Sequence, residues 1–255
     1  GGARGGQVKK DTKVNLTGGT ITHDAYGGGQ GTANIAADVL GNTTVELNNN
    51  NNGRTVDGSK RGCAVNRIFG ANNVNGSPKS HVLVHVFGTQ NKNLGSIRNK
   101  IDVTAANVDD LSSYDVTSVF GGGNAADYVP ADTCAKKYAE VIIEGCDLTS
   151  IHEVYGGRQA LKGPATDVLI KGTKIIDNVF GGGYDALSSV DESSVTIYGG
   201  EIRGSVHGGG EIATIGRGSV KESSSAGSSA NSVREFEAIY RIGHTHVEMF
   251  NGHTT

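Results

Sequence analysis

Three residues near the C-terminal end of the chain have types and spacing that suit metal chemistry. His244, His246 and Glu248 alternate along the sequence, so a strand would present all three on one face. Imidazole and carboxylate groups are zinc ligands, and His253 lies nearby in the sequence. The competing interpretation is a solvated strand face, because no second cluster repeats this spacing. We therefore predict no metal site and keep these residues as the weak candidates.

Adjacent acidic residues are the next candidates for acid–base chemistry. Asp109 and Asp110 form one pair, and Asp191 and Glu192 form another. Cleavage of polysaccharides needs clustered carboxylates, but neighbouring residues on a strand point to opposite faces. The pairs therefore indicate solvated edges or turns. A Gly-x-Ser-x-Gly elbow and a phosphate-binding loop are also missing from the sequence, so we predict that the chain is not an enzyme.

Two glycine-rich stretches with an aspartate resemble calcium-binding β-roll repeats. They run from Gly121 to Asp127 and from Gly181 to Asp185. A β-roll needs a nine-residue glycine and aspartate period, which the chain lacks. We predict no cofactor, and calcium bound at an isolated loop through aspartate and carbonyl oxygens is the alternative.

Glycine runs that follow an aromatic residue or a histidine return along the whole chain. From Gly156 to Gly181 is 25 residues and from Gly181 to Gly208 is 27, which indicates a repeat architecture. From Gly70 to Gly121 is 51 residues, about two periods, which predicts a turn that has lost its glycine run. The phrase occupies residues 25–29, 68–70, 119–123, 154–157, 179–183 and 206–210.

Aliphatic pairs spaced by two precede the glycine runs. This spacing places both members of a pair on one face of a strand. Glycine-containing corners follow most pairs, and glycine reaches a positive φ without a Cβ clash. The pairs are Val14/Leu16, Val45/Leu47, Ile101/Val103, Val141/Ile143, Val168/Ile170, Val195/Ile197 and Val247/Met249.

Short strands, tight corners and a constant period together predict an all-β fold. We expect a right-handed parallel β-helix whose coils of 25–27 residues share one core, with roughly nine coils in the stack. A β-sandwich is the competing class, but it does not explain the similarity between units. Residues 1–255 are expected to form a single domain that is an internal fragment of a longer chain.

Three segments interrupt the repeat and are predicted to be loop insertions: 49–65, 124–138 and 218–233. Insertions in solenoids often carry the binding surface. The three cysteines, Cys63, Cys134 and Cys146, are too few for a disulfide framework. Free thiols are the favoured interpretation, and a bond between Cys134 and Cys146 stays open.

The residue before each glycine run predicts a stacked column. If the preceding valines face the core, these residues face outward and align as an aromatic ladder that could stack on sugar rings. The alternative is that the following loop covers the ladder or that the chain turns it inward, because large exposed apolar patches are rare. The ladder residues are Tyr26, Phe69, Phe120, Tyr155, Phe180 and His207.

Composition excludes several classes of partner. The net charge is -3 and no basic stripe is recognisable, so nucleic acid is not an expected partner. No apolar run approaches the roughly 18 residues that span a bilayer, so no membrane insertion of this segment is predicted.

Several segments resemble the very large repetitive β-helix proteins on the surface of gut bacteria. The residues that carry the resemblance are 68–73, 75–79, 144–147, 175–183 and 197–200. The resemblance implies an adhesin-like protein that is secreted or at the bacterial cell surface, with flanking coils of the same chain. It also implies a glycan or a host surface protein as partner. No catalytic residues come with the family, so the expected role is structural or adhesive. A glycan-binding or polysaccharide-degrading β-helix, acting as a lyase or hydrolase, is the alternative.

Overall fold

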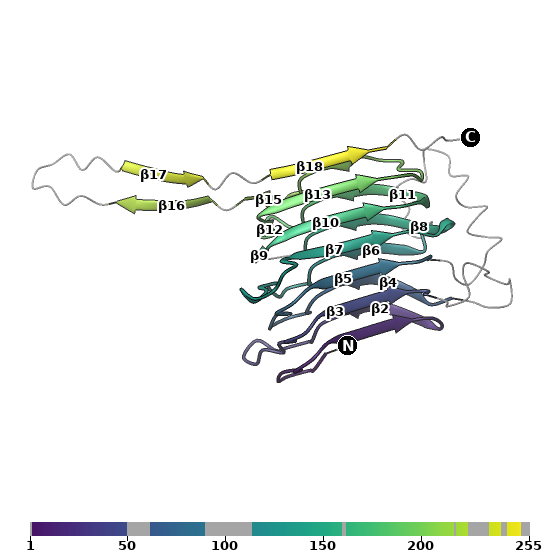
Figure 1. Ribbon diagram of the computed structural model, residues 1–255, viewed down its shortest axis with the longest axis horizontal. Helices are drawn as coiled ribbons and strands as arrows, with labels where there is room; N and C mark the ends of the chain where they lie inside the picture. The colour runs from purple at the N-terminus through teal and green to yellow at the C-terminus, as the bar shows by residue number, and fades with distance from the viewer. Residues whose placement is uncertain are drawn as a thin grey trace, which may run out of the picture.

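The chain folds into stacked parallel β-sheets (Figure 1). The computed structural model describes residues 2–49, 62–89, 114–159, 162–216, 218–223, 235–240 and 244–250, and every regular element in these ranges is a strand. The predicted all-β class is therefore confirmed, and the parallel pairing is compatible with the predicted β-helix. In the described ranges no helix is long and apolar enough to cross a membrane.

The largest sheet contains seven parallel strands. Its strands, in spatial order, are β1 (Thr12–Leu16), β3 (Thr43–Leu47), β5 (Val82–Val86), β7 (Tyr138–Ile143), β10 (Ala165–Ile170), β13 (Glu192–Ile197) and β18 (His244–Met249). Spatial order follows chain order, so each pass of the chain adds the next strand to one edge.

A six-stranded sheet is built from the strands that come between them. Its members are β2 (Thr20–Tyr26), β4 (Ala64–Phe69), β6 (Val116–Phe120), β8 (Cys146–Tyr155), β11 (Thr173–Phe180) and β14 (Val206–His207). A short third sheet contains β9 (Lys162–Gly163), β12 (Ser189–Val190) and β15 (Thr214–Ile215). We use the term layer for one pass of the chain. A layer consists of one strand of the large sheet, the next strand in the second sheet, and the segment that leads to the following strand of the large sheet.

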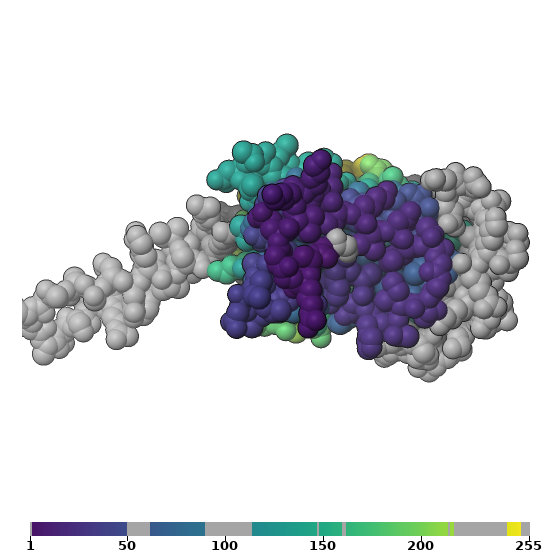
Figure 2. Space-filling view, turned by 90° about the horizontal axis from the view of Figure 1, so that it is seen from below, coloured from purple at the N-terminus to yellow at the C-terminus, as the bar shows by residue number. Residues whose placement is uncertain are grey.

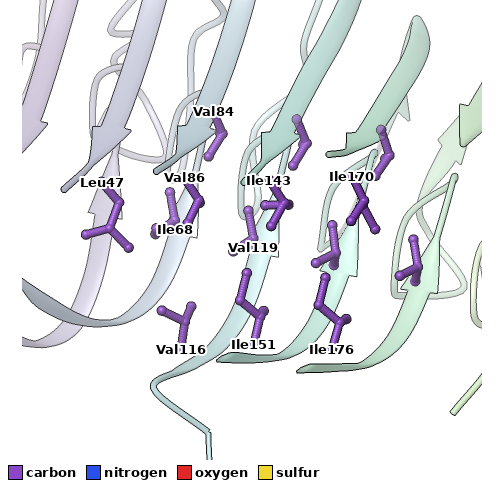
Figure 3. Packing of buried hydrophobic residues seen from close by; sticks show 14 of the residues in the cluster. Leu47, Ile68, Val84, Val86, Val116, Val119, Ile143, Ile151, Ile170 and Ile176 are labelled. Carbon is purple, nitrogen blue, oxygen red and sulfur yellow. The ribbon is translucent and has the colours of Figure 1, made fainter. Parts of the chain in front are cut away.

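The core consists of aliphatic columns that run through the layers in register. Val141, Val168 and Val195 are direct partners at intervals of 27 residues, and all three are fully buried. Ile68, Val119 and Val154 form the matching column of the second sheet. Figure 3 shows Ile68 and Val119 among other buried side chains of this cluster, which lie between the strands of the two sheets. Alternation with a period of two thus places one face of each inner strand of the two sheets in the core.

The structure differs from the predicted repeat in two details: the interval between Gly70 and Gly121, and the number of layers in the described ranges. β4 pairs directly with β6, and Phe69 lies beside Phe120, so the 51-residue interval is one layer with a long connection. β5 pairs directly with β7, and its core residues Val84 and Val86 supply the aliphatic pair of that layer. Ile101 and Val103 lie outside the described residues. The large sheet accordingly has seven strands in the described ranges, fewer than the roughly nine coils expected.

The glycine runs are required by close approach between layers. A Cβ at Gly121 would collide with the carbonyl oxygen of Gly156, and a Cβ at Gly156 with that of Gly181. Positive φ is found instead at the other corners, as at Gly145 and Gly200, both at 111°. The two kinds of corner therefore need glycine for different physical reasons.

The predicted insertions have narrower boundaries than expected. Ala64 and Val65 belong to β4, and Tyr138 begins β7. The segment 124–137 lies between β6 and β7 in the chain. It packs on the preceding layer, and Ala131 N donates to Lys79 O at 2.8 Å.

The insertion at 218–233 contains regular structure. β16 (Gly218–Ser223) pairs antiparallel with β17 (Glu235–Tyr240), so its first residues are strand instead of loop.

The two outermost strands of the large sheet lie at opposite ends of the stack. Figure 2 looks onto the N-terminal end, where residues of the first layer, in dark purple, lie across the molecule. At the other end the strand β18 has exposed side chains, with Met249 64% exposed. Each end therefore presents a strand that is paired on one side only in the described residues.

Candidate functional site

The predicted aromatic ladder exists and is regular. Successive rings are nearly parallel, with interplanar angles of at most 9° and centroid distances of 4.7–5.0 Å. This distance matches the spacing between neighbouring strands, so backbone register sets the stacking. The column runs Tyr26, Phe69, Phe120, Tyr155, Phe180 and His207.

Burial decides between the two interpretations of the ladder. Phe69 and Tyr155 are fully buried, Phe120 is 3% exposed and Phe180 is 6% exposed. Tyr26 is partly buried, and His207 at the end of the column is exposed. A sugar ring cannot reach the four buried rings of the ladder. The ladder therefore does not form a continuous carbohydrate platform in this structure.

Residues beyond the glycine runs contact the ladder and each other. Asn124 Nδ2 donates to Asn73 Oδ1 at 2.9 Å. Tyr184 meets the Tyr155 ring edge-on at a centroid distance of 5.8 Å, and the Tyr155 hydroxyl donates to Glu211 at 2.5 Å. Burial, and then the bond to Glu211, raises the pKa of Tyr155. The hydroxyl therefore stays protonated as a donor.

An ion pair lies beside the first rings of the ladder. Arg67 donates from Nε and Nη2 to the two oxygens of Asp24, both at 2.8 Å, and from Nη1 to Gln159 at 3.0 Å. Its guanidinium carbon lies 5.3 Å from the centroid of Phe69. The hydrogen bond to Asp24 raises the pKa of Arg67. These contacts hold three layers together and leave the guanidinium committed to internal partners.

The outer face of the large sheet carries titratable groups that sequence reasoning missed. His85 Nε2 lies 2.7 Å from Glu144 Oε1, and His81 Nε2 lies 3.0 Å from Glu140 Oε2. Asp167 is the direct strand partner of Glu140. We call these five residues the histidine–carboxylate cluster.

Protonation differs between the two neighbouring carboxyl groups of this cluster. His81 beside Glu140 lowers the pKa of that carboxyl group. Burial, and then the charge of Glu140, raises the pKa of Asp167. Lys136 Nζ lies 3.5 Å from Glu140, and Tyr138 packs edge-on against His81. A carboxyl pair with opposed pKa shifts is able to donate and accept protons at one place.

Matched spacing was the sequence signal for this cluster. His81 and His85 are four residues apart, and so are Glu140 and Glu144. Because β5 and β7 are parallel neighbours, both histidines meet their glutamates with the same diagonal offset. A column of charged groups was not recognised in the sequence, because the partners are separated by 59 residues.

The metal candidates do not come together with further ligands in the described part of the chain. His244, His246 and Glu248 share an exposed face of β18, with His246 Nε2 3.7 Å from Glu248. His253 lies outside the described residues. The described ranges contain no group of three or more histidine, cysteine or acidic residues placed to hold a metal ion.

The aspartates of the two glycine-rich stretches have protein partners. Asp127 Oδ1 accepts two hydrogen bonds from Arg158, each at 3.1 Å, and Asp185 Oδ1 accepts one from Leu187 N. The acidic pair Asp109 and Asp110 lies outside the described residues.

The three cysteines are free thiols in the structure. Cys63 is buried, Cys134 is partly buried and Cys146 is exposed. The pairing of Cys134 with Cys146 that the sequence left open is not present.

Comparisons with protein-family models, with curated protein sequences and with solved structures found no match for the chain. What the protein does is therefore inferred from its own residues.

Proposed function

We propose that the chain is a right-handed parallel β-helix that serves as a structural and adhesive segment of a bacterial cell-surface protein. The observation that carries this proposal is the buried ladder. The repeated aromatic phrase, the most regular feature of the sequence, is used for packing between layers, with four rings at most 6% exposed. A repeat used in this way builds a stiff scaffold and leaves binding to the surface of the layers and to their connecting segments.

Adhesion to a glycan or a surface protein is supported by the ordered connecting segments. The segment 124–137 is held against the preceding layer by backbone and side-chain bonds, including Val129 N to Ser77 Oγ at 2.7 Å. The hydroxyl of Tyr128 donates to Ser80 O at 2.8 Å. Loops that are held by a rigid scaffold are common sites of recognition.

Two measurements test the proposal. Antibodies raised against the 255-residue chain should label intact cells of the bacterium that produces it. The purified chain should bind a subset of glycans on an array or surface proteins of host cells. Labelling only after lysis would contradict the surface location. Binding to neither class of partner would contradict adhesion and leave a spacer.

A glycan-degrading activity is the second candidate, favoured by the Glu140 and Asp167 pair. Their opposed pKa shifts provide the acid and base that glycoside cleavage uses. The test is product release from a panel of polysaccharides, with Glu140→Gln as the disabled variant. Glu46→Gln, on another strand of the same sheet, is the control. Equal release by both variants, or none by the wild type, would exclude this activity.

A further inference from the structure

A recess lies among the connecting segments of the first three layers. Its lining comes from residues 36 and 38 in the first layer, 74–77 and 79 in the second and 125–127 in the third. The volume is about 330 Å³, near the lower end of the roughly 300–1,000 Å³ typical of small-molecule sites. The recess therefore has space for a ligand of the size of a mono- or disaccharide.

The two carboxylates that line the recess are held rigidly from behind. Asp38 Oδ1 accepts a hydrogen bond from Ser77 N at 2.8 Å. Asp127 Oδ1 accepts bonds from Arg158 and from Lys162 N, the latter at 2.9 Å. Within the described residues, all of these bonds use Oδ1, which leaves each Oδ2 as an acceptor for a ligand. Fixed acceptors lower the entropy cost of binding.

Charge balance favours a neutral ligand. Lys79 Nζ lies 3.7 Å from Asp38, and the fully buried Arg158 lies 3.1 Å from Asp127. Each carboxylate is thus already paired with one protein cation. A metal ion or a basic side chain bound in the recess would be repelled by the ammonium group of Lys79. Hydroxyl groups, in contrast, can donate to the carboxylates and accept from the ammonium group.

Four of the other lining residues are apolar and suit the C–H face of a sugar ring, while Asn75 and Ser77 are polar. Val74 is 41% exposed, and Ala36, Ala125 and Ala126 also line the recess. Apolar contacts beside a few fixed polar groups are a common feature of small-ligand sites.

We propose that this recess binds a neutral sugar residue, whose hydroxyl groups donate to Asp38 and Asp127 and whose C–H face packs on Val74. The inference rests on the proposed adhesive function, because it names the ligand class and the place where it binds.

The test uses saturation-transfer NMR on the full chain with the methyl glycosides of glucose, galactose, mannose and N-acetylglucosamine as probes. At least one glycoside should receive saturation, and Val74→Glu should weaken that binding at least five-fold. Val247→Glu is the matched control, because Val247 is also a valine that is 41% exposed, and it lies outside the recess lining. Asp38→Asn should also weaken binding, since its amide oxygen can still accept from Ser77 N while the charge is lost.

Several outcomes would overturn the assignment. Absence of saturation for all four glycosides would do so, as would equal weakening by Val74→Glu and Val247→Glu. Calcium that shifts resonances of the recess, with no glycoside bound, would identify a cation site instead. If array glycans bind the wild type and Val74→Glu equally, adhesion stands and the recess assignment fails. If the wild type binds no glycan in either assay, glycan adhesion fails too.

Discussion

The imidazole of His85 meets the carboxylate of Glu144 at 2.7 Å across two neighbouring parallel strands. The same imidazole stacks on Phe87 with a centroid distance of 3.8 Å. Burial lowers the pKa of His85 below its ordinary value of 6.5, and the hydrogen bond to Glu144 partly opposes this shift. The neutral imidazole is therefore favoured in the folded chain.

Replacing Glu144 with glutamine should lower the pKa of His85 further, because the anion that offsets burial is removed. An NMR titration of the His85 ring measures this directly. Glu46→Gln is the control, because Glu46 is the weakest of the acidic influences on this imidazole and its loss should shift the pKa much less. An unchanged pKa in Glu144→Gln would show that the two side chains do not interact in solution.

Asp115 should make stability depend on pH between about 4 and 7. Burial raises the pKa of this carboxyl group from 3.8 to about 7, opposed by the hydrogen bond from Thr89. The folded chain therefore holds a proton in this range that the unfolded chain releases. The contribution of Asp115 to stability should be fully present below about pH 4 and be lost, by about 4 kcal/mol, as the pH rises to about 7. Asp115→Asn should remove this dependence of the free energy of unfolding on pH. Urea unfolding at several pH values measures it.

The control for that experiment is Asp132→Asn, because the Asp132 side chain is fully exposed. Its slope should equal that of the wild type. A slope that persists in Asp115→Asn would assign the pH dependence to another group.

Phe120→Ala should destabilise the chain by about 3–5 kcal/mol, since it opens a cavity between two stacked rings. Phe250→Ala is the matched comparison. Phe250 is also stacked, on Tyr198 at 4.8 Å, but it is 46% exposed, so its loss should cost less than about 1 kcal/mol. Chemical unfolding measures both. A small effect at Phe120 together with lost glycan binding would return the ladder to the role of a ligand platform.

Gly121→Ala should be destabilising by about 1–3 kcal/mol or more, because the added methyl group meets the Gly156 carbonyl of the next layer. Gly209→Ala provides the control in an equivalent run. The nearest atom to a Cβ there is a methylene of Ile215 at 3.7 Å, an ordinary contact. The difference in melting temperature between the two variants checks whether layer contact, and not glycine flexibility, explains the repeated geometry of the corner.

Local alternation predicted much of the architecture. Pairs such as Val168/Ile170 and Val195/Ile197 are core residues in direct register. Intervals between glycine runs were less reliable. A long connection and a missing turn give the same spacing, and only the pairing of β4 with β6 distinguishes them.

The site residues likewise include features that follow from local sequence and features that depend on distant parts of the chain. The ladder was predicted as a stack, but burial of Phe69 and Tyr155 depends on what the segment after the glycines covers. The contact between His85 and Glu144 depends on β5 and β7 being neighbours, although a long stretch of chain separates them.

Which residues alternate into the core and where the corners come can be read from the local sequence, because both are properties of a few consecutive residues. The tertiary structure decided which layers are adjacent, which aromatic faces are covered and which charges meet. These depend on contacts between residues far apart in the chain, and insertions of variable length separate such residues without changing their register.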